Sequence, residues 1–160
     1  MGIATGKTIL LVEDEVIIAM TERAMLEKHG YTVRVANTGE KAVEMAMAHK
    51  DIDLILMDIN LGPGIDGTEA ATMILEERDI PLAFLSSHTE REVVEKTEGI
   101  TSYGYIVKNS GDTVLLASML MAFRLHEAHK NIQAQRMDIE AAYELFAHQR
   151  DGVMKVAITP

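Results

Sequence analysis

Short apolar runs alternate with amphipathic stretches along most of this chain, and this alternation constrains the fold more than any other feature. Strands are predicted near residues 8–12, 32–36, 53–58, 81–85 and 103–107. Helices are predicted near residues 15–29, 38–49, 67–77, 89–97 and from about 111 onward. A strand–helix unit repeated five times is typical of a parallel sheet with helices on both faces. The sequence therefore predicts an α/β fold built on a doubly wound, five-stranded sheet.

Four of the predicted strands end in polar residues. These are Glu13 and Asp14 after the first strand, Asp58 after the third, Ser86 after the fourth and Lys108 after the fifth. Open parallel sheets place their sites at the carboxyl ends of the strands. We therefore expect three carboxylates, a hydroxyl and an ammonium group to meet at one edge of the sheet.

This set of side chains suits chemistry with a metal ion and a phosphoryl group. Magnesium prefers oxygen ligands and usually takes one or two carboxylates, completed by waters and phosphate oxygens. A carboxylate such as Asp58 can act as a nucleophile and form an acyl phosphate. Asn60, two residues later, can offer its backbone carbonyl to the metal. Each residue alone also has an ordinary explanation, as a helix cap or a solvated strand end.

Taken together, these motifs resemble the receiver domain of the two-component response-regulator family. The matching segments, which lie within residues 7–124, are residues 10–15 (LLVEDE), 56–58 (LMD), 66–67 (DG), 85–87 (LSS) and 105–108 (YIVK). The resemblance implies a flavodoxin-like, chemotaxis-receiver-like sheet of strand order 2-1-3-4-5. It also implies that the chain catalyses only its own phosphotransfer and autodephosphorylation.

The resemblance assigns roles to the polar residues. Asp58 would accept phosphate from the phosphohistidine of a histidine kinase or phosphotransfer protein. Magnesium would be held by Asp14, Asp58 and the carbonyl of Asn60, with Glu13 reaching the metal through water.

The remaining roles concern the switch. Lys108 would pair with the phosphoryl group, and Ser86 would swing toward it on activation. Tyr105 matches the family's switch aromatic, whose rotamer follows the Ser86 shift. The change would be relayed through the face formed by the fourth helix, the fifth strand and the fifth helix.

One departure from the family pattern leaves an alternative open. Asn109 follows Lys108 where the family usually has a proline in a cis bond. A cis bond before another residue costs about 2.5–4 kcal/mol, which favours a trans peptide and a reshaped loop. A pseudo-receiver that binds partners without phosphorylation is therefore the alternative. A magnesium-dependent phosphatase with an Asp nucleophile is disfavoured, because such enzymes usually need an acid at the position of Asn60.

The C-terminal part of the chain predicts one extended helix. No Gly or Pro interrupts residues 113–146, and its first turns are expected to pack on the sheet. Leu125, Ile132, Ile139 and Phe146 then recur every seven residues, which suits a two-stranded coiled coil and a homodimer. The alternatives are a helix that folds back and a linker. Gly152 is expected to end the helix, and residues 153–158 to form a strand.

These patterns divide the chain into a receiver domain (1–124), a helical extension or linker (125–150) and a tail that starts a downstream domain (151–160). The net charge of −10 argues against direct nucleic-acid binding, which depends on Lys and Arg. No apolar run is long enough for a membrane span, and cysteine is absent, so we expect a cytoplasmic protein. Met20, Met45 and Met73 occupy helix positions expected to face the core.

Overall fold

A computed structural model describes residues 6–87, 95 and 103–158 of the chain, with side chains described as far as residue 147. Five parallel strands form one sheet in the order β2-β1-β3-β4-β5. The strands are β1 (Thr8–Val12), β2 (Thr32–Ala36), β3 (Ile52–Asp58), β4 (Leu82–Ser86) and β5 (Tyr105–Val107). The helices are α1 (Val16–Lys28), α2 (Gly39–Ala48), α3 (Gly67–Glu77) and α5 (Asp112–Ile158). The predicted fold class and strand order are confirmed.

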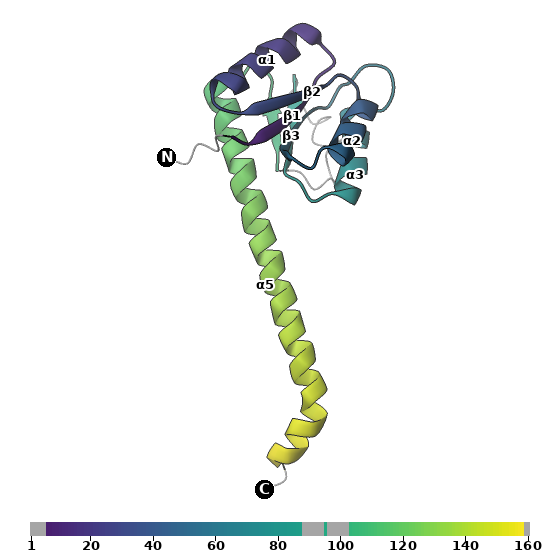
Figure 1. Ribbon diagram of the computed structural model, residues 1–160, viewed down its shortest axis with the longest axis vertical. Helices are drawn as coiled ribbons and strands as arrows, with labels where there is room; N and C mark the ends of the chain where they lie inside the picture. Colours follow the sequence, from purple (N-terminus) through teal and green to yellow (C-terminus); the bar gives the residue numbers. More distant parts are fainter. Residues whose placement is uncertain (1–5, 88–94, 96–102, 159–160) are drawn as a thin grey trace. The chain divides into compact units, whose positions relative to one another are not determined.

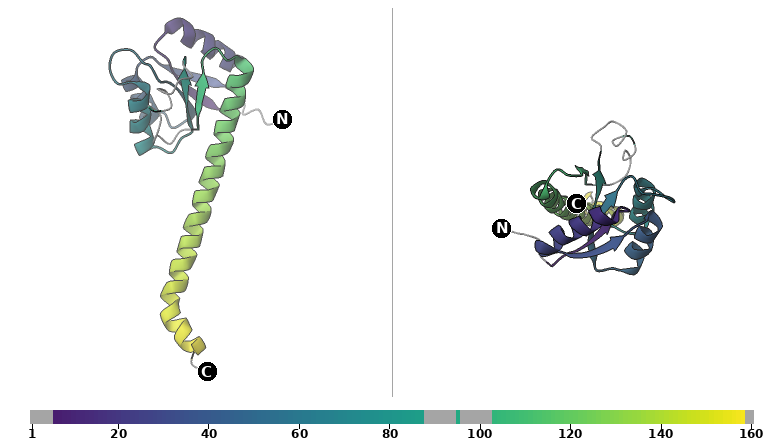
Figure 2. Two further views of the ribbon diagram at one scale, coloured as in Figure 1. Left: turned by 180° about the vertical axis from the view of Figure 1, so that it is seen from behind. Right: turned by 90° about the horizontal axis from the view of Figure 1, so that it is seen from above.

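The sheet is the centre of two apolar cores. Every residue of β1 and β4 is buried, as expected for parallel strands that are covered on both faces. Successive side chains alternate between the cores, because strand residues point to opposite faces in turn. Leu10 and Val12 pack in one core, whereas Ile9 and Leu11 pack in the other. Helices α2 and α3 cover the first face, and α1 and the start of α5 cover the second (Figures 1 and 2).

Local polar contacts fix the helix ends. The Thr38 hydroxyl accepts a hydrogen bond from the Lys41 N–H at 3.0 Å and caps α2. Asp66 and Glu69 form a capping box at the start of α3. Gly30 follows α1 with φ +93°, a conformation that glycine adopts at low cost at a helix C-terminus.

Arg78, directly after α3, ties the turn between α2 and β3 to the rest of the domain. Its guanidinium donates to the carbonyl oxygens of Ala46, His49, Lys50 and Ile52 at 2.7, 3.0, 3.1 and 2.6 Å. One side chain therefore supplies a charged donor to four backbone carbonyls at the end of α2, in the following turn and at the start of β3.

The chain forms two compact units, Met1–His126 and Glu127–Pro160. Within the first unit, Leu115, Met119 and Ala122 of α5 are buried in the core, as expected for its first turns. Lys7 lies over the Phe123 ring at 5.1 Å, and His126 Nε2 lies 3.1 Å from Asp79 Oδ1. In the second unit, Ile132, Ile139 and Phe146 are exposed. No helix of the described part of the chain is both long and apolar enough to cross a membrane.

Three local predictions are corrected by the structure, and one lies beyond it. Helix α5 continues through Gly152 to Ile158, so the strand predicted over residues 153–158 is wrong. Glycine costs only about 1 kcal/mol in a helix, which neighbouring turns can offset. Met20 and Met73 are 65% and 46% exposed, because Ala19 and Ile74 take the core-facing positions beside them. The helix predicted near 89–97 lies outside the described residues, apart from Glu95.

Candidate functional site

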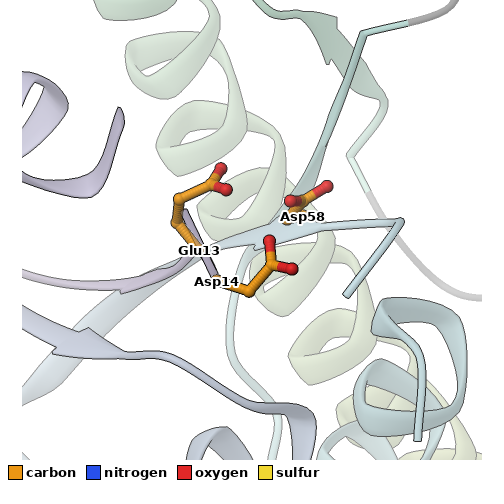
Figure 3. Close-up of side chains that lie close together, drawn as sticks. All are labelled: Glu13, Asp14 and Asp58. Atoms are coloured by element: carbon orange, nitrogen blue, oxygen red, sulfur yellow. The ribbon is translucent and has the colours of Figure 1, made fainter. Parts of the chain in front are cut away.

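Three carboxylates converge where β1 and β3 end. Asp58 is the last residue of β3, and Glu13 and Asp14 directly follow β1. Val12 pairs with Met57 across the sheet, so the residues that follow them lie side by side. One oxygen from each carboxylate lies within 4.8 Å of the others (Figure 3). Glu13 and Asp58 are only 1% and 3% exposed. Three carboxylates this close together repel one another, so a nearby positive charge is needed to stabilise their ionised forms.

Lys108 supplies part of that charge. Its Nζ donates to Glu13 Oε2 at 2.7 Å and to Asp58 Oδ2 at 2.9 Å. The backbone N–H of Lys108 donates to the Ser86 carbonyl at 2.6 Å. This hydrogen bond holds the start of the loop after β5 against the end of β4. One ammonium group therefore bridges two buried acids, an arrangement that needs close hydrogen bonds to offset the loss of solvation.

Backbone donors hold the second oxygen of each buried acid. The Glu15 N–H donates to Glu13 Oε1 at 3.1 Å, and the Asn60 N–H donates to Asp58 Oδ1 at 3.1 Å. Each carboxylate is thus fixed on one side by Lys108 and on the other by the main chain. The orientation of both acids is set before any ligand binds.

The main chain at Asp58 is also fixed by the start of α3. A Cβ atom at Gly67 would overlap the Asp58 carbonyl oxygen and lie 2.8 Å from its carbonyl carbon. Only glycine permits this approach of α3 to the end of β3.

Burial and the neighbouring charges shift the pKa values of the cluster. Burial raises the pKa of Asp58 to about 6, although the Lys108 ammonium opposes this and the Glu13 charge adds to it. Burial acts to lower the pKa of Lys108, but its hydrogen bonds to Glu13 and Asp58 outweigh burial and raise it. Asp58 therefore gives up its proton less readily than an ordinary carboxyl group, even with Lys108 in place.

The two predicted switch residues lie on neighbouring strands. Ser86 is the last residue of β4 and is fully buried, one position beyond Leu85, which pairs with Asp58. Tyr105 begins β5, pairs with Phe84 and is 42% exposed. The structure thus brings Ser86 to the same edge as the acids and leaves the Tyr105 ring accessible to solvent.

The sequence model of the response regulator receiver domain matches residues 9–120, which include the whole cluster. The chain belongs to the response regulator receiver domain family. Membership of this family gives it a role in two-component signalling.

Individual relatives agree with this assignment. The transcriptional regulatory protein PdtaR of Mycobacterium tuberculosis is 34% identical over 120 residues, which cover 74% of this chain. The matched part makes up only 58% of PdtaR, so this chain spans little more than half of that relative's length.

Two solved structures are similar over most of the chain. The N-terminal domain of a response regulator/sensory box/GGDEF protein from Carboxydothermus hydrogenoformans is 47% identical, with a TM-score of 0.72. The matched region covers 77% of this chain and 98% of the solved chain. A fusion protein that contains the trimeric coiled coil of yeast Spc42 is 44% identical, with a TM-score of 0.76. The matched region covers 92% of this chain and 98% of the solved chain.

The loop after β5 of this receiver domain departs from the family pattern as expected. The described residues contain no cis peptide, so the Lys108–Asn109 bond is trans. Asn109 has φ +65°, a left-handed conformation that Asn tolerates better than most residues. Lys108 nevertheless reaches both acids, so the loss of the proline has not removed the ammonium group from the site.

Glu22 is a receiver residue that sequence reasoning missed. Its Oε2 is buried and has no hydrogen-bond partner among the described residues. Burial raises its pKa to about 7; the Glu13 charge adds to the shift, Lys108 opposes it, and Asp58 adds a smaller contribution. The spacing of Glu22 in the sequence could have predicted its burial. Ala19, Glu22 and Leu26 are separated by three and four residues, which is the period of a core-facing helix stripe.

Proposed function

We propose that Asp58 accepts a phosphoryl group from the phosphohistidine of a histidine kinase or phosphotransfer protein. The observation that carries the proposal is the pair of hydrogen bonds from Lys108 to Glu13 and Asp58. One carboxylate oxygen of Asp58 attacks phosphorus, and the P–N bond of the phosphohistidine breaks. The imidazole nitrogen keeps the electron pair and takes up a proton.

The residues at the site fit a magnesium ion. One oxygen from each of the three carboxylates lies within 4.8 Å of the others, and oxygen atoms are the ligands that magnesium prefers. Asp14, Asp58 and the carbonyl of Asn60 would hold the ion, with Glu13 reaching it through water. When bound, magnesium neutralises charge on the acids and on the transferred phosphoryl group.

The phosphoryl group turns this site into a switch. It adds about 1.5–2 negative charges beside Glu13 and Asp14, so Lys108 must engage its oxygens. Ser86 moves to donate its hydroxyl to the same oxygens, and the exposed Tyr105 ring turns inward. We expect a partial population shift, since moving an equilibrium from 1:99 to 99:1 takes about 5.5 kcal/mol. The output face would be formed by β5, α5 and the helix predicted from the sequence near residues 89–97.

We further propose that α5 pairs with α5 of a second copy of the chain. Leu125, Ile132, Ile139 and Phe146 are all exposed at seven-residue intervals. A run of large apolar residues at this period is stable in water when a partner helix covers it. Direct nucleic-acid binding is not part of the proposal.

The intact acidic cluster and its lysine favour a phosphoacceptor over a pseudo-receiver. Labelling with acetyl phosphate, followed by intact-mass spectrometry, tests this. We expect magnesium-dependent labelling of the natural chain and none of the Asp58→Asn variant. Asp51→Asn is the matched control, because Asp51 is an exposed carboxylate directly before β3 that pairs with Arg34. Labelling that persists in Asp58→Asn would refute the assignment, and so would an unlabelled natural chain that also fails to bind beryllofluoride.

A further inference from the structure

A cavity of about 310 Å³ lies between α1 and the loop after β5. Its lining contains none of the three clustered carboxylates, but it shares Lys108 with the proposed phosphoacceptor site. Glu22 and Met25 line it from α1, Asn109 and Ser110 line it from the loop, and Asp112 and Leu115 line it from α5. The loop takes its course through left-handed conformations at Asn109 and Gly111. The volume of the cavity is in the range of small-ligand sites.

Glu22 gives this cavity its chemistry. Its Oε2 is buried and has no hydrogen-bond donor among the described residues. A buried acceptor without a donor costs about 1–3 kcal/mol, more when it is charged. A small rotation of the Glu22 carboxylate toward an N–H group in the cavity would remove this cost.

The charges around Glu22 favour a cationic occupant. Glu13 and Asp58 face it from the strand ends, Lys108 from the end of β5 and Asp112 from the start of α5. The Lys108 ammonium is already shared between Glu13 and Asp58. The acids therefore outnumber the one lysine, and the uncompensated charge is negative. Burial is the main cause of the raised pKa of Glu22, and the negative charge of Glu13 adds to it.

We propose that this cavity binds an alkylammonium or guanidinium group, which donates N–H hydrogen bonds to Glu22. Two kinds of molecule carry such a group. It belongs either to a free small amine or to a Lys or Arg side chain of a partner protein.

Titration of the ¹⁵N-labelled full chain with methylguanidinium chloride tests the proposal. Ionic strength is held constant with potassium chloride, and the amide signals of residues 21–25 and 108–112 are followed. We expect saturable shifts in these two segments. N-methylurea has a similar planar shape and keeps three of the five N–H donors but carries no charge, so it should bind at least about tenfold more weakly.

Two variants make the test specific to the carboxylate. Glu22→Gln keeps the shape and removes the charge, so methylguanidinium should bind it at least about tenfold more weakly. Glu27→Gln removes an exposed carboxylate from the same helix and should leave the affinity unchanged. Unsaturable shifts, equal binding of N-methylurea, or full affinity in Glu22→Gln would each overturn the proposal.

A blocked Ala-Arg-Ala peptide identifies the source of the group. Tighter binding of the peptide than of methylguanidinium assigns the cavity to a partner's side chain, and equal or weaker binding assigns it to a free cation. All titrations use the unphosphorylated chain, so their outcome does not depend on whether Asp58 accepts phosphate.

Discussion

The Lys108 ammonium lies 2.9 Å from Asp58 Oδ2, although the two residues end different strands and are 50 positions apart in the chain. The same nitrogen lies 2.7 Å from Glu13 Oε2. Glu13 and Asp58 are almost fully buried, so water cannot screen the charge of either carboxylate. We therefore expect the stability of the domain and the reactivity proposed for Asp58 to depend on the ammonium group of Lys108.

Replacement of Lys108 by methionine should destabilise the domain markedly at pH 8. Removing one partner of a buried ion pair typically costs about 3–5 kcal/mol, because the remaining charge stays buried. Urea unfolding followed by circular dichroism measures this loss. Lys41→Met is the control, since Lys41 is exposed and its contact with Glu44 is 3.4 Å long. A loss no greater than that of the control would contradict the bridging role.

Glu22→Gln should stabilise the domain at alkaline pH. The folded-state pKa of Glu22 is raised from 4.5 to about 7, so its protonated form favours the native state. This contribution is fully present below pH 4.5 and is lost as the pH rises through 7. The variant should match the natural chain at pH 4 and exceed it by about 1–2 kcal/mol at pH 8, after allowing for the partial exposure of Glu22.

Urea unfolding at several pH values measures this difference, with Glu27→Gln as the control. A constant difference between the Glu22→Gln variant and the natural chain across this range would show that Glu22 titrates normally.

Gly67→Ala should weaken both folding and phosphorylation. The added methyl group would overlap the Asp58 carbonyl oxygen, so the end of β3 or the start of α3 must move. Overpacking of this kind costs about 1–3 kcal/mol. Unfolding midpoints and acetyl-phosphate labelling rates report the two effects. Thr72→Ala, on an exposed position of the same helix, should change neither quantity substantially.

Arg78→Ala should destabilise the domain by about 2–4 kcal/mol, because four backbone carbonyls lose their charged donor. Arg78→Lys should recover only part of this loss, since an ammonium group cannot reproduce the planar set of donors. Thermal unfolding compares the two variants with Arg34→Ala, which removes an exposed ion pair with Asp51. Equal stability of the lysine variant and the natural chain would argue against the role of guanidinium geometry.

Ile132→Asp should convert a dimer of the full chain into a monomer. The substitution places a charge in the apolar ladder of α5, where a partner helix would have to bury it. Sedimentation velocity over a range of concentrations measures the change. Met137→Asp is the matched control, because Met137 is also exposed on α5 but lies outside the ladder. A natural chain that is monomeric at every concentration would remove the basis of the pairing proposal.

The sequence predicted the sheet and the position of the acids well, for a physical reason. Each buried strand has a run of apolar residues, and parallel strands deliver whatever follows them to one edge. Asp58, Glu13, Asp14 and Lys108 were therefore predicted to lie together. Which acids share the Lys108 ammonium was not predictable, because it depends on side-chain directions and on the loop after β5.

The errors have equally specific causes. Glu22 was missed because an acid on the buried stripe of a helix reads as an ordinary surface residue when the spacing is not examined. Met20 was misplaced by one helical position, about 100° of rotation. Gly152 was taken as a helix end, although its cost is small compared with the stabilisation that the adjoining turns provide.

The close approach of Gly67 to the main chain of Asp58 couples two parts of the domain mechanically. With no free space between them, a displacement of the strand end is not absorbed locally and has to push the first turn of α3 along with it. A movement at Asp58 would therefore also be transmitted to the face of the sheet that α2 and α3 cover.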